Sequence, residues 1–128
     1  MYPVTMLAAV ILGLWLIILS IRVIDVRRTT GIDAHEAPSR ELARRIRAQA
    51  NLVEYAPIAL ILLFLAEASA ASIWVTGFCA TLLIVGRLVH GIAFSFKDSW
   101  VFGRVGGMGM TFGSIALLAL TNVWLLFF

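Results

Sequence analysis

The segment RAQANLVEYAPIALILLFLA, Arg47–Ala66, joins a polar helical face directly to an uncharged apolar run. Arg47, Asn51 and Glu54 are spaced i, i+4 and i+7, which places them on one face of an α-helix. Glu54 is the only charge between residues 48 and 66. The segment therefore predicts a membrane helix with a polar face near one end, and Pro57 is expected to bend the helix just past that face.

The rest of the chain has the same membrane character. Of its 128 residues, 62% are hydrophobic and only 13% are charged, whereas a soluble domain has about a quarter charged residues. Three further uncharged runs, at residues 1–21, 68–86 and 105–128, are long enough to cross a bilayer as helices. We expect one all-α integral membrane domain, an up-and-down bundle of four transmembrane helices. Their expected limits are about 3–26, 39–67, 73–96 and 104–127.

The distribution of charge predicts the orientation of this bundle. All ten Lys and Arg lie in two windows, 22–47 and 87–104, which are the first and third connections with their flanks. The positive-inside rule places both on the cytoplasmic side and both termini outside. Trp74 and Trp124 then reach the outer interface and Trp100 the inner one, as in an aromatic belt. The net charge of +3 is explained by orientation and contact with inner-leaflet lipids, so we expect no nucleic-acid partner.

The first connection has the composition of a loop. The stretch RRTTGIDAHEAPS, Arg27–Ser39, mixes glycine, proline and charges without an apolar period, and its His35 and Glu36 are expected to be solvated. Ser39, followed by Glu41, is a candidate N-cap of the second helix.

Three features concern the packing of the interior. RVGGMGMTFG, Arg104–Gly113, contains four glycines that would let another backbone approach closely, as at membrane helix interfaces. Trp15 falls in the middle of the first span and is expected to pack against another helix. Cys79 is the single cysteine, expected as a small buried hydrophobe, so we predict neither a disulfide nor a metal site.

Ionisable residues inside the spans gather at one depth. Glu54, Arg87 and His90 lie within spans, and Arg47 and Arg104 lie nearer the interface. In an up-and-down bundle all five fall in the cytoplasmic half. Each such residue costs about 2.5–3.5 kcal/mol at a helix centre, so it needs a partner or a wet cavity. Because arginines outnumber carboxylates, the cluster suits an anionic ligand; the alternative is a network that locks the bundle, with Glu54 paired to Arg87.

Two motifs resemble a known family. The frame R-x-x-x-N-x-x-E-x-x-P, at Arg47, Asn51, Glu54 and Pro57, is similar to the second-helix signature of the MAPEG family, the membrane-associated proteins in eicosanoid and glutathione metabolism. RLVHGIAF, Arg87–Phe94, resembles the R-x-x-H segment of the microsomal glutathione transferases and their bacterial relatives. The resemblance covers the whole chain.

By analogy, the resemblance implies a homotrimer that binds glutathione between neighbouring subunits near the cytoplasmic face of a bacterial inner membrane. Arg104 would be the catalytic cation that stabilises the glutathione thiolate. The expected activity is that of a glutathione transferase, with peroxidase activity as an extension, on lipophilic electrophiles from the bilayer. The residues expected to line the glutathione site are Arg28, with its neighbour Arg27 as the alternative, Arg47, Gln49, Asn51, Glu54, Tyr55, Arg87 and His90.

One difference from the family and two other functions bear on this expectation. Phe94 and Phe96 stand where eicosanoid-forming members carry tyrosines, which argues against leukotriene synthesis. A protein of the same fold could bind lipid or thiol without turnover. A small proton-coupled exporter also has four spans, but it carries its critical carboxylate in the first helix, and residues 1–21 hold no charge here.

Overall fold

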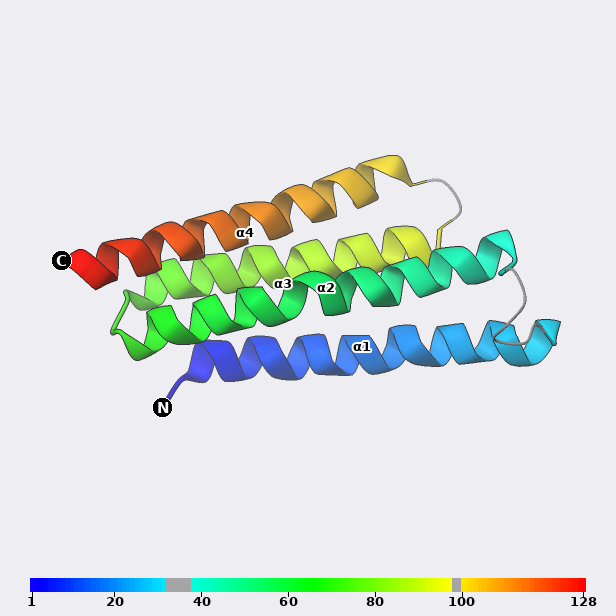
Figure 1. Cartoon of the computed structure of the whole chain (residues 1–128), viewed down its shortest axis with the longest axis horizontal. Helices are drawn as coiled ribbons and strands as arrows, with labels where there is room; N and C mark the ends of the chain where they lie inside the picture. Colours follow the sequence, from blue (N-terminus) through cyan, green and yellow to red (C-terminus); the bar gives the residue numbers. More distant parts are fainter. Residues whose placement is uncertain (32–37, 98–99) are drawn as a thin grey trace.

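The computed structural model describes residues 1–31, 38–97 and 100–128. Within these ranges the chain forms four α-helices: α1 (Pro3–Thr30), α2 (Arg40–Ala68), α3 (Ile73–Ser95) and α4 (Val101–Phe127). They run up and down side by side, with both termini at the end where α2 connects to α3 (Figure 1). Each is long and apolar enough to cross a membrane. The predicted all-α class and its four spans are confirmed.

Two helix boundaries differ from the predicted ones. α1 continues to Thr30, four residues beyond the expected end, so the first turn of the predicted loop is helical. It ends at Gly31, whose φ of 64° is left-handed and whose N–H donates to the Arg27 carbonyl at 3.1 Å, an arrangement that glycine adopts readily. α4 begins at Val101, so Arg104 lies in its first turn and does not open it.

The second helix begins where the sequence indicates. The Ser39 hydroxyl accepts a hydrogen bond from the Leu42 N–H at 3.2 Å, which confirms the predicted N-cap. α2 then continues through Pro57 without interruption. The expectation that His35 and Glu36 are solvated concerns residues outside the described ranges.

The interior face of α1 packs against α2 and α3 through residues spaced three or four apart. Trp15 is buried in this face, and its indole N–H donates to the Arg87 carbonyl of α3 at 3.2 Å. The ring lies against Gly91, where an added Cβ would come within 2.7 Å of the indole nitrogen. The prediction that Trp15 packs against another helix is confirmed, and α3 is that helix.

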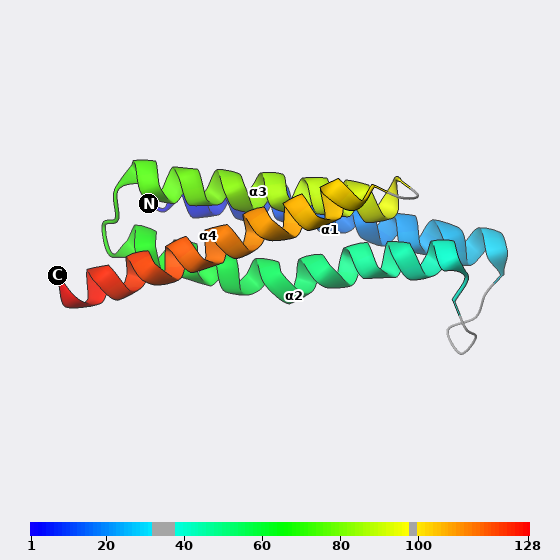
Figure 2. The same ribbon diagram turned by 90° about the horizontal axis from the view of Figure 1, so that it is seen from above.

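α3 and α4 approach most closely at a pair of glycines. A Cβ on Gly86 would lie 2.8 Å from the Gly107 carbonyl oxygen, and a Cβ on Gly107 would lie 2.7 Å from that of Gly86. The expected close approach is thus found at Gly107. Added Cβ atoms at Gly106, Gly109 and Gly113 would meet nothing within 4 Å, so that side of α4 is uncovered in the single chain. Figure 2 shows α4 crossing the bundle obliquely.

Three tryptophans lie at the ends of the bundle and the single thiol lies inside it. Trp74 is in the first turn of α3 and Trp124 in the last turn of α4, so these exposed rings share the end of the bundle that holds both termini, whereas Trp100 lies at the opposite end. Cys79 is buried, 1% exposed.

A carboxylate for which the sequence predicts no structural role joins α2 to α1. Glu67, in the last turn of α2, accepts hydrogen bonds from the N–H groups of Val4 and Thr5, at 3.0 and 2.9 Å. These N–H groups belong to the first turn of α1, where intrahelical acceptors are missing and the helix dipole favours negative charge. Glu67 therefore caps a helix 62 residues away in the sequence.

Replacing Glu67 by alanine should lower the free energy of unfolding by about 1–2 kcal/mol, because two donors at a helix start lose their acceptor. Glu67→Gln keeps one neutral acceptor, so its free energy of unfolding should fall by a smaller amount. Circular dichroism during unfolding in mild detergent measures both. Ser72→Ala is the control, since Ser72 is exposed at the same end and its side chain makes no capping bond; equal losses in all three variants would contradict the role of Glu67.

Gly107→Ala should cost about 1–3 kcal/mol, because the new methyl group would collide with a backbone oxygen that cannot move alone. Gly106→Ala, its neighbour, adds a methyl group in open space and gains helix propensity of up to about 1 kcal/mol. Denaturation in mixed micelles compares the two variants. A Gly107→Ala protein as stable as the Gly106→Ala protein would show that this helix contact is looser than described.

Candidate functional site

Arg87 is the centre of a buried polar network that joins three helices. The side chain is 2% exposed and belongs to α3. Its Nε donates to the Thr111 hydroxyl of α4 at 2.8 Å, and its Nη1 donates to the Asn51 side-chain oxygen of α2 at 2.6 Å. Its Nη2 approaches the Met108 sulfur at 3.2 Å and the Gly107 carbonyl at 3.5 Å. A buried guanidinium has five donors to satisfy, and neutral groups of the chain satisfy most of them.

The pairing of Glu54 with Arg87, which the network alternative required, does not form in the described chain. Arg87 contacts neutral oxygens and a thioether, and Glu54 lies exposed on α2. The orientation of α2 explains the difference. Asn51 is partly buried in the bundle, whereas Glu54 is exposed, so Asn51 is the residue that bonds to Arg87.

An open groove lies on the surface of α3 and α4, beside this network. Its volume is about 580 Å³. His90 and Phe94 of α3 and Arg104, Met108 and Phe112 of α4 contribute to its wall. The Arg104 guanidinium carbon lies 5.1 Å from the centre of the Phe94 ring, a cation–π distance, and the His90 and Phe94 rings are 4.8 Å apart. The groove thus combines a cation and an imidazole with aromatic and thioether surface.

Tyr55 connects the groove to the buried network. Its ring meets Phe112, a groove residue, edge-on at 5.4 Å between centroids. The Arg87 guanidinium carbon lies 5.8 Å from the centre of the same ring. Because Met108 also touches both Arg87 and the groove, the position of Arg87 determines the shape of the groove wall.

Two predicted site residues of α2 use their side chains inside the chain. Gln49 donates to the Ser20 hydroxyl of α1 at 2.9 Å, on the side away from α4. Asn51 accepts from Arg87. Three other predicted residues, Arg28, Arg47 and Glu54, are exposed on the described chain. Of the sequence-predicted residues, the structure therefore brings His90 and Arg104 together in the groove, with Tyr55 at its edge.

Two exposed charged residues of α2 require a polar partner that the described part of the single chain does not provide. Glu54 lies in a helix of membrane-spanning length, and an ionised carboxylate facing acyl chains is costly. Arg47 lies two turns before it on the same side. A second polar surface or a charged ligand would satisfy both.

Several groups that shape the site were not singled out from the sequence. Thr111 lies one turn after Gly107 and anchors the Arg87 Nε. At the end of α3, Arg22 of α1 donates to the Ser95 hydroxyl and carbonyl at 2.8 and 2.7 Å, and its guanidinium lies 3.6 Å from the centre of the Phe96 ring. The repeated small and hydroxyl residues of α4 were a signal for Thr111; Arg22 carried no distinguishing spacing.

Comparison with known proteins agrees with this architecture. A model of the MAPEG family matches residues 5–124. The inner membrane protein YecN of Escherichia coli K12 is 33% identical over 122 residues, which cover 94% of this chain and 91% of that protein. YecN of Escherichia coli O6:H1, strain CFT073, matches to the same extent. Because the family match extends across all four helices, the chain belongs to the MAPEG family of membrane proteins.

Proposed function

We propose that this protein is a membrane glutathione transferase that activates the glutathione thiol for attack on lipophilic electrophiles. The observation that carries the proposal is Arg104, a cation beside aromatic rings in an open groove on a membrane bundle. Such a groove suits a substrate with one anionic atom and an apolar partner. Family membership supports the choice of glutathione.

The chemistry of glutathione matches the charges near the groove. The tripeptide has two carboxylates, one ammonium group and a thiol. Arginine pairs with carboxylates through two parallel hydrogen bonds, and the exposed Arg28 and Arg47 are available for this role. Glu54 is the matching partner for the ammonium group. Arg104 is then the cation that would interact with the sulfur.

In the proposed reaction, the thiol loses its proton to water at the mouth of the groove. A free thiol has a pKa of about 8.5 and is only a few per cent thiolate at pH 7. The Arg104 cation favours the thiolate over the thiol. The sulfur then forms a bond to the electrophilic carbon, and the leaving group departs with the electron pair of the broken bond. Phe94 and Phe112 give the lipophilic substrate an apolar surface.

The proposal includes a homotrimer in a bacterial inner membrane, with the site towards the cytoplasm. The exposed Arg47 and Glu54 and the uncovered glycine side of α4 are surfaces that another copy would cover. All ten Lys and Arg lie in the half of the bundle opposite the two termini, which supports a cytoplasmic end. YecN is named an inner membrane protein.

The second candidate is a lipid- or thiol-binding protein without catalysis. It is favoured by the internal hydrogen bonds of Gln49 and Asn51, since both residues are expected at the glutathione site and each already uses one of its two side-chain polar groups within the chain. This candidate predicts binding without formation of a thiolate.

Glutathione titrated into the purified protein at neutral pH should produce the ultraviolet absorbance of a thiolate. Arg104→Ala should reduce this signal at least about tenfold, which corresponds to one pKa unit. Arg40→Ala is the control, because Arg40 is an exposed cation at the same end of the bundle. Heat of binding without absorbance would favour the non-catalytic candidate, and an unchanged signal in Arg104→Ala would remove Arg104 from the mechanism.

Native mass spectrometry in mild detergent should give a complex of three times the 14.0 kDa of one chain. Glu54→Leu should leave this mass unchanged if Glu54 faces a ligand, and should break the complex if it makes a contact between copies. A wild-type complex that stops at two copies would contradict the proposed trimer.

A further inference from the structure

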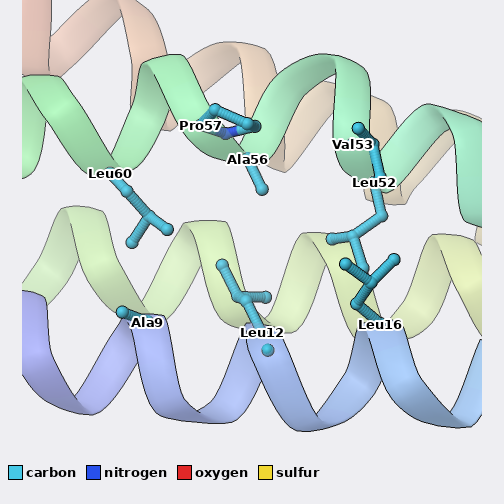
Figure 3. Close-up of a pocket in the computed structure, with 9 residues that line it drawn as sticks. Ala9, Leu12, Leu16, Leu52, Val53, Ala56, Pro57 and Leu60 are labelled. Carbon is cyan, nitrogen blue, oxygen red and sulfur yellow. The ribbon is translucent and has the colours of Figure 1, made fainter.

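A second, separate groove lies between α1 and α2. It measures about 200 Å³ and is lined only by apolar residues. Figure 3 shows Leu12 and Leu16 of α1 facing Leu52, Ala56 and Leu60 of α2, with α3 passing behind. Gly13 leaves the groove open, because a Cβ at this position would meet nothing within 4 Å. The α3–α4 groove shares none of these residues.

The distance between the two ends of this groove limits the length of a ligand that can occupy it. The hydrogen bond from Gln49 to Ser20, 2.9 Å long, bridges α1 and α2 just beyond Leu16. From Ala9 at the other end to Ser20 is a rise of about 16 Å along a helix. This is about half the ~30 Å thickness of the hydrocarbon layer, which is the depth that the chains of one leaflet fill.

A cation lies in line with the groove at its Ser20 end. Leu16, Ser20 and Arg27 are spaced i, i+4 and i+11, so they lie along one face of α1. Arg27 is exposed and lies about 10 Å beyond Ser20 along the axis. A long arginine side chain at this depth can reach the level of lipid phosphates.

We propose that the α1–α2 groove binds one acyl chain of a phospholipid whose phosphate contacts Arg27. The apolar lining excludes a charged tripeptide, the span to Ser20 fits the chain of one leaflet, and Arg27 matches an anionic headgroup. The lipid is a resident component of the fold, and its binding does not depend on the proposed transferase activity.

Photocrosslinking tests this binding. The protein is reconstituted with phosphatidylglycerol that carries a diazirine in mid-chain, irradiated, and the adducts are located by mass spectrometry. We expect adducts in residues 12–16 and 53–60 at higher yield than at Val10 and Ile21, which are exposed on α1 outside the groove. Even yields over all exposed positions, or no adducts in the groove, would overturn the proposal; the second result is also what a second protein copy in the groove would give.

Substitutions that fill the groove test whether the crosslinked lipid occupies it. Gly13→Phe should lower the yield of groove adducts to the level at Val10 and Ile21, because the new ring occupies the space of the acyl chain. Gly77→Phe is the matched control, because a Cβ there also meets nothing within 4 Å and Gly77 lies on α3. Gly13→Leu replaces Gly13→Phe if the larger ring prevents folding. Diacylglycerol with the same labelled chain should give a lower yield than phosphatidylglycerol, and Arg27→Gln should abolish that difference; unaltered yields in these variants would contradict the proposal.

Discussion

The half of the bundle opposite the two termini depends on one buried cation. Arg87 is surrounded by α2 and α4 and bonds to Asn51 and Thr111, so its loss would remove the donor that serves the Asn51 amide oxygen and would leave the Thr111 hydroxyl only its bond to the Gly107 carbonyl. Buried donors and acceptors without partners cost more than the net energy of the bonds themselves. The rotation of α2 and α4 about their axes is therefore tied to α3. The Gly86–Gly107 contact brings α4 close enough for the Arg87 side chain to reach Thr111.

This constraint separates two arginines that look alike in the sequence. Arg87 and Arg104 both belong to the ionisable cluster that the sequence predicts at one depth of the bundle, yet Arg87 is enclosed by neutral oxygens and Arg104 stands in an open groove. The enclosed residue maintains the wall of the groove through Met108 and Tyr55, and the open one is accessible to a ligand. Two hydrogen bonds join α1 to α3: Trp15 donates to the Arg87 carbonyl, and Arg22 donates to the Ser95 hydroxyl. The apolar α1–α2 groove is independent of the polar groove.

Much of this architecture could be predicted from residue patterns. Uncharged runs predicted the four spans, since helices crossing lipid must be long and apolar. Ser39 as a cap and a close helix contact within the four glycines of Arg104–Gly113 followed from local chemistry, although the sequence did not indicate that Gly107 makes that contact. The partner of Arg87 could not be predicted, because Asn51 and Glu54 differ by less than one turn and only tertiary packing decides which one faces inward. The role of Glu67 depends on two helix ends meeting in space, and the positions of Gln49 and Asn51 depend on the rotation of α2.

The central functional claim is that Arg104 acts on the sulfur of a bound glutathione. The most direct measurement is a structure of the protein in lipid with glutathione bound. The sulfur is expected within about 4–6 Å of the Arg104 guanidinium, the range over which a cation lowers the pKa of a neighbouring acid, with the tripeptide beside α2. Glutathione bound with its sulfur turned away from Arg104, or bound outside the α3–α4 groove, would contradict it.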